Sequence, residues 1–280
     1  MENKKIFLVI GNPIKHSLSP LLHNYWFHKN KMNYVYKKLK INQAGIKKIL
    51  NKIRKKEIDG INVTIPFKRD IIKYLDILKG DALKTSSVNT VYLNKKNLVG
   101  DNTDVYGFSS GVIKKIKNRV RIAAIIGAGG VTSSVILALI QKGVKKIYIT
   151  NRTFSKLKIF RKNFKKVIYP VRWNNRYKAF GNVQILINVT SLGMLGKKDL
   201  KFDFSIFNKK INVVDIVYNP ENTRFLKDAR KSGHKTFTGM DMFIYQAQKA
   251  FYIWNKKKPK ITKDLYKKRS EEHTSELQSH

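Results

Sequence analysis

A glycine-rich segment near the middle of the chain could bind a phosphate group. Gly127, Ala128, Gly129 and Gly130 follow the apolar run Ile122 to Ile126 and precede a stretch with helical periodicity. Glycine lets the backbone approach a pyrophosphate closely, and the N-terminus of a helix offers N–H groups that have no partner within the helix. The segment is a candidate dinucleotide site, although a glycine turn before a helix can also be only a tight connection.

The end of the next expected strand favours NADP over NAD. Ile147 to Thr150 leads into Asn151, Arg152 and Thr153, about twenty residues after the glycines, where an NAD enzyme usually carries an acidic residue for the ribose hydroxyls. Arg152 suits the 2′-phosphate of NADP instead. Lys156 could assist it, or could be a solvated surface group.

The elements that would position these residues alternate along the chain. Short apolar runs, expected as strands, are separated by longer stretches with helical periodicity, which indicates an α/β fold. The expected strands are 6–10, 61–64, 122–126, 147–150, 185–188 and 213–217, and the expected helices are 131–142, 223–231 and 240–254. A second α/β unit begins after Tyr106, so we expect two domains, and the last helix has no strand after it and should pack back onto the first.

The most unusual feature of the composition is its large net positive charge. A formal net charge of +40 arises from 58 Lys and Arg against 18 Asp and Glu in 280 residues, which raises the hypothesis of nucleic-acid binding. Lysines occur in almost every segment, however, whereas a binding face would concentrate them, and no RNA-binding or zinc-finger signature accompanies them. We expect no specific nucleic-acid partner, and a positive field that helps to capture anionic substrates.

The composition also limits the chemistry and the compartment. The absence of cysteine excludes disulfides, thiolate metal sites and cysteine nucleophiles. The apolar run Ile6 to Ile10 is too short for a signal-peptide core or a membrane span. We expect a cytoplasmic chain without a bound metal or a membrane contact. Arg269 to His280 lacks apolar periodicity, and we interpret it as an artefactual or disordered tail.

Clusters of polar residues along nearly the whole chain resemble the shikimate dehydrogenase family in order and spacing. They are residues 11–20, 62–68, 88–90, 100–104, the glycine turn, 151–153, 188–194, 215–218, and Gln246 with Ala247. The resemblance implies a substrate domain over 1–106 that is completed by the C-terminal helix 240–268, and a Rossmann NADP domain over 107–239. It also implies NADP-dependent, reversible reduction of 3-dehydroshikimate to shikimate in aromatic amino-acid biosynthesis, by a monomer or a homodimer.

The residues of the first domain can be assigned roles within this resemblance. Ser17 and Ser19 offer two hydroxyl donors, which by resemblance hold the carboxylate of shikimate; Ser19 could also be a helix N-cap. Lys68 and Asp104 are the expected catalytic pair: the lysine exchanges a proton with the reacting oxygen or stabilises its charge, and the aspartate orients it and accepts a substrate hydroxyl. The full set expected to bind substrate is Ser17, Ser19, Thr64, Lys68, Asn89, Asp104, Tyr218 and Gln246.

The resemblance assigns a second set of residues to NADP: Gly127, Ala128, Gly129, Gly130, Val131, Asn151, Arg152, Thr153, Lys156, Ile216 and Gly239. Val131 and Thr132 replace the small residues expected after the glycines, and Ser86 with Ser87 replaces a more usual Gly-Ala pair. Two alternatives remain: an NAD-dependent quinate/shikimate dehydrogenase, against which Arg152 argues, and a basic nucleic-acid-binding protein on a degenerate enzyme scaffold.

Overall fold

The computed structural model describes residues 4–266, so the tail expected over 269–280 lies outside the described residues. The chain divides into two units. Unit 1 contains the described residues up to Thr103 together with those from Gln246 onward, and unit 2 is Asp104–Tyr245. The boundaries expected after residues 106 and 239 lie a few residues from these divisions.

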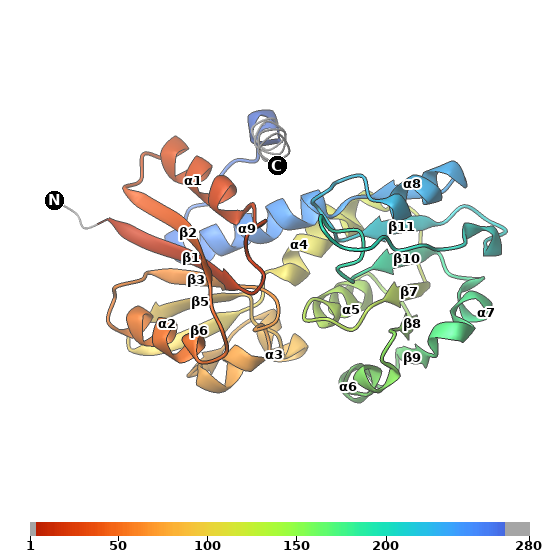
Figure 1. Ribbon diagram of the computed structural model, residues 1–280, viewed down its shortest axis with the longest axis horizontal. Helices are drawn as coiled ribbons and strands as arrows, with labels where there is room; N and C mark the ends of the chain where they lie inside the picture. Colours follow the sequence, from red (N-terminus) through yellow and green to blue (C-terminus); the bar gives the residue numbers. More distant parts are fainter. Residues whose placement is uncertain (1–3, 267–280) are drawn as a thin grey trace. The chain divides into compact units, whose positions relative to one another are not determined.

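Unit 1 is built on a mixed six-stranded sheet with the order β2-β1-β3-β5-β6-β4 (Figure 1). β2, β1 and β3 are parallel, whereas β5 is antiparallel to both β3 and β6. The strands are β1 (Lys5–Gly11), β2 (Tyr34–Lys40), β3 (Gly60–Val63), β4 (Ile77–Leu78), β5 (Thr90–Asn94) and β6 (Asn97–Asp101). The helices are α1 (Ser19–Lys29), α2 (Gly45–Arg54), η1 (Asp70–Tyr74) and α3 (Asp81–Thr85).

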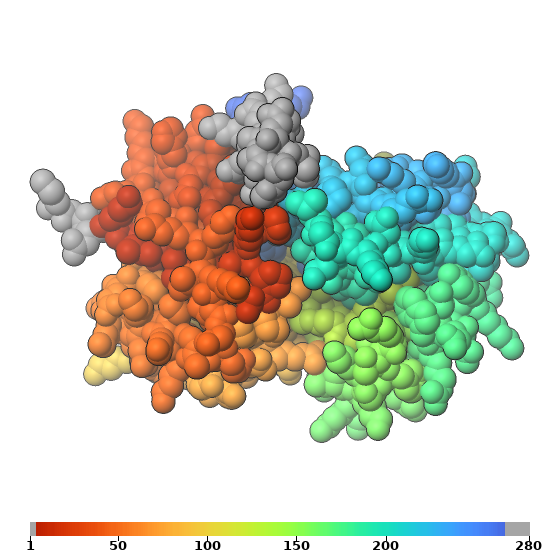
Figure 2. Space-filling view, viewed as in Figure 1, coloured from red at the N-terminus to blue at the C-terminus, as the bar shows by residue number. Residues whose placement is uncertain are grey.

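Both faces of this sheet are covered, because side chains alternate along β1. Leu8 and Ile10 point to one face, where they join the apolar stripe of α2 in one core cluster. That stripe consists of Ile46, Ile49, Leu50 and Ile53, which are buried. The outer side of α2 belongs to the orange surface of unit 1 in Figure 2, where its lysines are solvated.

The opposite face carries an aromatic cluster. Phe7 of β1 lies 5.5 Å from Phe27 of α1 and 4.9 Å from Trp254 of α9 (Gly239–Asn255), measured between ring centroids. A Cβ on Gly60 would lie 2.6 Å from Nε1 of Trp254, so β3 needs glycine where the tryptophan packs. The later part of α9 thus packs on unit 1. The helix ends at Asn255, well before the end of the segment 240–268 assigned to it.

His23 is buried within the same cluster. Its ring stacks on Tyr36 at 4.4 Å and 3°. Neither ring nitrogen has a hydrogen-bond partner within residues 4–266, and burial lowers the pKa of His23 to about 3. The ring is therefore a neutral packing element at physiological pH.

Unit 2 contains a fully parallel sheet in the order β12-β11-β10-β7-β8-β9. This is the Rossmann order, in which the strand sequence reverses between the adjacent β7 and β10. The strands are β7 (Ile122–Ile126), β8 (Lys146–Thr150), β9 (Ile168–Val171), β10 (Ile185–Asn188), β11 (Asn212–Asp215) and β12 (Lys235–Phe237). The fold is therefore α/β with a Rossmann-type second unit, as the sequence predicts.

Helices cover both faces of this second sheet. One core cluster joins α4, α5 and α6 to one face, and another joins α7 and α8 to the other. The helices are α4 (Asp104–Gly111), η2 (Ile113–Lys115), α5 (Thr132–Gln141), η3 (Phe154–Leu157), α6 (Lys158–Asn163), η4 (Trp173–Asn175), α7 (Arg176–Phe180), η5 (Phe204–Ile206) and α8 (Arg224–Lys231). None of the helices over residues 4–266 is long and apolar enough to cross a membrane.

Candidate active site

In unit 1 the polar clusters meet at one edge of the sheet. β1 and β3 are parallel, so the segments that follow Gly11 and Val63 leave at the same edge. Thr64 N donates to Ile10 O at 3.0 Å, which joins the two strand ends. A Cβ on Gly11 would lie 2.5 Å from Cγ2 of Thr64, so the glycine allows this close approach.

Asn89 is the centre of a buried hydrogen-bond network at this edge. Its side-chain amide donates to Thr103 Oγ1 at 2.9 Å and to Gln246 Oε1 at 3.5 Å, and its Oδ1 accepts from the backbone N of Thr103 at 2.8 Å. Asn62 donates to Asn89 O at 3.0 Å and accepts from the Tyr36 hydroxyl at 2.7 Å. The network thus fixes two residues expected to bind substrate, Asn89 and Gln246.

Lys68 is half-buried in the turn that follows β3. Its carbonyl accepts from Val88 N at 2.8 Å, and the preceding Phe67 is a buried core residue whose N donates to Thr64 O at 3.0 Å. The backbone beneath the lysine is therefore anchored to the same edge. Asp104, its expected catalytic partner, is the first residue of α4 and is only 4% exposed. It belongs to unit 2.

The two serines lie in the segment between β1 and α1. Ser17 is half-buried and its N donates to Ile14 O at 3.1 Å, while Ser19 is buried as the first residue of α1. The N-cap position is occupied by Leu18, and no side chain caps the helix. The alternative role of Ser19 as an N-cap is therefore wrong, and a carboxylate-binding role for both hydroxyls stays a prediction.

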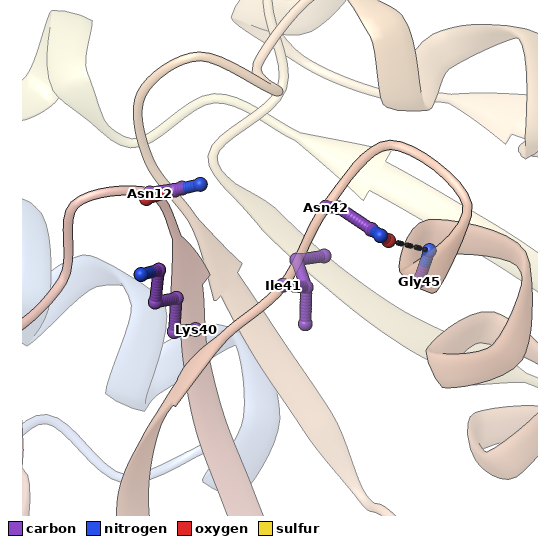
Figure 3. A pocket seen from close by; sticks show the side chains of 5 residues that line it. All are labelled: Asn12, Lys40, Ile41, Asn42 and Gly45. Atoms are coloured by element: carbon purple, nitrogen blue, oxygen red, sulfur yellow. Dashed lines mark hydrogen bonds between the residues drawn. The ribbon is translucent and has the colours of Figure 1, made fainter.

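A hollow of about 400 Å³ lies beside the segment that follows β1. Figure 3 shows its lining, where Asn42 Oδ1 accepts from the N of Gly45 at 3.0 Å. The lining residues are Asn12, Lys40, Ile41, Asn42 and Gly45. None of the residues expected to bind substrate is among them, so this hollow forms no part of the expected site.

In unit 2 the glycine turn lies where the strand order reverses. Gly127 has a φ of 124°, which an L side chain rarely adopts, and a Cβ there would lie 2.9 Å from Cγ2 of Thr190. At Gly129 the nearest atom to an added Cβ would be Val189 O at 4.0 Å. The turn is thus held tightly at Gly127 and open at Gly129, and it leads into α5. This geometry fits a pyrophosphate at the helix N-terminus.

Asp215 organises the loop that packs against this turn. The carboxylate accepts hydrogen bonds from Asn188 Nδ2 at 3.0 Å, Val217 N at 3.0 Å and Thr223 Oγ1 at 2.7 Å. Asn188 Oδ1 accepts in turn from Thr190 Oγ1 at 2.7 Å and Thr190 N at 3.0 Å. Burial of Asp215 raises its pKa to about 6, although all three donors favour the charged form.

Other residues expected to bind NADP lie after β8, after β11 and at the first position of α9. Arg152, Thr153 and Lys156 are exposed, and Asn151 Nδ2 donates to Thr153 O at 3.0 Å, which shapes their turn. Ile216 follows β11, and a Cβ on Gly239 would overlap the Ile216 carbonyl at 2.1 Å.

Tyr218, which follows Ile216 closely in sequence, stacks on Phe243 at 4.3 Å. Within the described part of the chain, no group of three or more His, Cys, Asp or Glu residues is placed to hold a metal ion.

Sequence reasoning missed several residues that support these sites. Thr103 and Asp215 lie inside clusters that resemble the family, but the sequence does not indicate a role for them, and only their hydrogen bonds reveal one. Tyr36 lies outside every cluster, and no sequence signal links it to Asn62, which lies 26 positions away.

Comparisons with known proteins identify both units. The model for the shikimate dehydrogenase substrate binding domain matches residues 9–91, and the model for shikimate / quinate 5-dehydrogenase matches residues 112–223. The shikimate dehydrogenase (NADP(+)) of Pelagibacter ubique is 44% identical over 259 residues, which cover 92% of this chain and 96% of that protein.

Solved structures extend the likeness to the fold. The crystal structure of shikimate dehydrogenase from Aquifex aeolicus has a TM-score of 0.85 and 33% identity, and the match covers 96% of this chain and 98% of that one. The Thermus thermophilus enzyme in complex with NADP(H) and shikimate has a TM-score of 0.82 and 28% identity, over 91% of this chain and 95% of that one. The chain therefore belongs to the shikimate dehydrogenase family.

Proposed function

We propose that this chain catalyses the NADP-dependent, reversible reduction of 3-dehydroshikimate to shikimate, a step toward chorismate and the aromatic amino acids. The observation that carries the proposal is the amide and hydroxyl network of the buried Asn89 and Thr103 with the half-buried Gln246, at the polar edge of unit 1. A ring with several hydroxyl groups needs both donors and acceptors in its pocket, and these side chains supply both.

The substrate contacts follow from the residue types. Ser17 and Ser19 hold the carboxylate through their hydroxyls. Thr64, Asn89, Tyr218 and Gln246 bind the ring hydroxyls. Asp104 accepts a hydrogen bond from one substrate hydroxyl and orients Lys68.

The proton chemistry is assigned to Lys68. NADPH supplies a hydride to the carbonyl carbon when it is bound, and the carbonyl oxygen must then gain a proton. The ammonium group of Lys68 donates this proton or stabilises the negative charge on the oxygen, and in the reverse direction the neutral amine takes the proton back. The assignment is supported by the half-buried side chain of Lys68 and by its backbone carbonyl, which accepts a hydrogen bond from Val88 N.

Unit 2 would hold the cofactor. The glycines 127–130 and the start of α5 would bind the pyrophosphate, and Asn151, Arg152, Thr153 and Lys156 would surround the 2′-phosphate. Ile216 and Gly239 would lie against the nicotinamide. The fit is supported by the positive φ of Gly127 and by the open space beside Gly129.

An NAD-dependent quinate/shikimate dehydrogenase is the alternative activity. An NAD enzyme is expected to carry an acidic residue at the end of β8, where this chain has Arg152. The arginine and the NADP-dependent relative both favour the main proposal.

We also propose that the enzyme works in the cytoplasm as a monomer or a homodimer, without a specific nucleic-acid partner. Its substrate is a small molecule, and its lysines occur in almost every segment of the sequence. Size-exclusion chromatography with light scattering would decide between the two oligomeric states.

The direct test is the loss of NADPH absorbance when 3-dehydroshikimate is added to the purified protein. We expect turnover of 3-dehydroshikimate with NADPH. Oxidation of quinate, and reactions with NAD in place of NADP, should be much slower. Salt-sensitive binding to duplex DNA without any dehydrogenase activity would overturn the proposal. Faster oxidation of quinate with NAD would favour the alternative.

A further inference from the structure

Arg172 lies at the same sheet edge as Arg152, although it is 20 positions further along the chain. β8 and β9 are parallel, and Thr150 pairs with Val171 at the last position of both strands. The Thr150 hydroxyl also donates to Val171 O at 3.0 Å. Asn151 and Arg172 therefore leave neighbouring strands side by side, at the carboxyl edge where dinucleotides bind in this sheet order.

The side chain of Arg172 is held in place by a ring. Its guanidinium carbon lies 5.0 Å from the ring centroid of Phe154, two residues after Arg152. Most cations in this basic chain are solvated, but a guanidinium stacked on an aromatic face loses less freedom when it binds a ligand.

The hydrogen-bond donors of Arg172 are not used within the protein. The Arg172 guanidinium makes no hydrogen bond or ion pair with residues 4–266. Arg176 offers a contrast, because it lies over the rings of Trp173 and Tyr177 at 4.1 Å each, and donates to Trp173 O at 2.7 Å and Tyr177 Oη at 2.9 Å. Arg176 is a structural arginine, whereas Arg172 is exposed.

We propose that Arg172 is a second NADP-specificity residue, which binds the 2′-phosphate together with Arg152. The planar guanidinium can donate two hydrogen bonds to one phosphate, which an ammonium group cannot match in geometry. The inference rests on the proposed function, because it needs NADP as the cofactor. The sequence motif indicates only residues 151–153, after β8, as the 2′-phosphate site. Arg172 adds a residue that follows β9 to this site.

The test measures binding rather than turnover. Titration calorimetry gives the Kd of NADP and of NAD for the wild type and for Arg172→Gln. We expect the Kd of NADP to rise roughly five- to tenfold, as for loss of a charge-assisted hydrogen bond at an exposed site, and the Kd of NAD to stay unchanged. Adenosine 2′,5′-bisphosphate should show the same loss, since it carries the 2′-phosphate without the nicotinamide.

Arg161→Gln is the matched control. Arg161 is also exposed, lies on α6 of the same unit, and its loss changes the net charge equally. We expect this variant to keep the wild-type Kd for both cofactors. A similar rise for Arg161→Gln would mean that only the overall field matters, which would overturn the inference.

Two further outcomes separate this inference from the proposed function. If the wild type prefers NADP and Arg172→Gln keeps the full preference, or weakens both cofactors equally, Arg172 only packs on Phe154 and the inference is wrong. If the wild type itself does not prefer NADP, the proposed function fails first.

Discussion

At the scale of single residues, the backbone around Lys68 is fixed by contacts that do not involve its side chain. Phe67 anchors the turn in the core, and the Lys68 carbonyl is bound by Val88 N. A substitution of Lys68 should therefore change chemistry more than folding. This separation makes the lysine a suitable residue for a kinetic test.

We predict that Lys68→Ala lowers kcat by about a hundredfold or more, the usual loss for a positioned acid/base group. The Kd of NADP should stay near the wild-type value, because the residues expected to bind the cofactor belong to unit 2. Steady-state kinetics and calorimetry would measure both quantities, with Lys48→Ala on the exposed side of α2 as the control. Near-normal turnover of Lys68→Ala would require another proton carrier.

Asp104→Asn should act in the same direction as Lys68→Ala. If the two side chains serve one proton-transfer step, the double variant should lose much less than the product of the single losses. Independent, multiplicative losses measured by kcat/KM would show that Asp104 has a separate role.

Arg152 offers a second test at the residue scale. Arg152→Asp places a negative charge where the 2′-phosphate is expected, so NADP should bind far more weakly while NAD binds nearly as before. The ratio of the two Kd values is the measurement. Equal weakening of both cofactors would contradict the assignment of Arg152 to the 2′-phosphate.

At the scale of elements, sequence patterns predicted best where a strand is buried on both faces. The apolar runs 122–126 and 185–188 match the bounds of β7 and β10, whose burial makes the run continuous. β2 (Tyr34–Lys40) was missed, because three of its seven residues are lysines on a largely exposed edge strand. β5 and β6 were also missed, since their alternation is short and interrupted by polar residues.

The hydrogen bonds of the candidate site could not be predicted from local sequence patterns either. Local motifs marked Asn89 and Gln246, but their hydrogen bond joins residues 157 positions apart. Such a contact depends on how strands and helices pack, and no local spacing encodes it. The Asp215 network is likewise spread over β10, β11 and the segment before α8.

The Asp215 network supports a prediction about pH. The folded-state pKa of about 6 is raised above the unfolded value of 3.8, so the folded protein binds a proton more tightly between these values. The contribution of Asp215 to the free energy of unfolding is therefore greatest below pH 3.8 and is lost as the pH rises through 6. The difference corresponds to about 3 kcal/mol.

The measurement compares melting temperatures of the wild type and Asp215→Asn. Because asparagine does not titrate, the wild type should gain stability relative to this variant as the pH falls from about 8 to about 5. Asp199→Asn, which removes a carboxylate at an exposed position of the same unit, is the matched control. A pH-independent difference for Asp215→Asn would show that the carboxyl keeps its ordinary pKa.

At the scale of the whole molecule, unit 1 is discontinuous in sequence. The sequence predicts that the last helix packs on the first domain, and the described residues from Gln246 onward do belong to unit 1. Gln248 donates to Pro259 O at 2.7 Å, and Trp26 Nε1 donates to Lys260 O at 3.1 Å, so the chain beyond α9 is tied to α1 as well. Without α9, this face of the sheet would be covered by α1 alone.

Two neighbouring aromatic residues of α9 test how much unit 1 depends on this cover. Phe251 is fully buried, with its ring 5.4 Å from Phe27 and 5.8 Å from Trp26, whereas Tyr252 is 43% exposed. Phe251→Ala should lower the free energy of unfolding by about 3 to 5 kcal/mol, because it leaves a cavity among the aromatic rings. Tyr252→Ala should cost less than about 1 kcal/mol, since it removes an exposed ring from the same helix.

Urea unfolding followed by tryptophan fluorescence would report on the cluster directly, because Trp26 and Trp254 both belong to it. Equal losses for the two variants would mean that α9 contributes helix formation rather than burial, and unit 1 would then hold its core without the C-terminal segment.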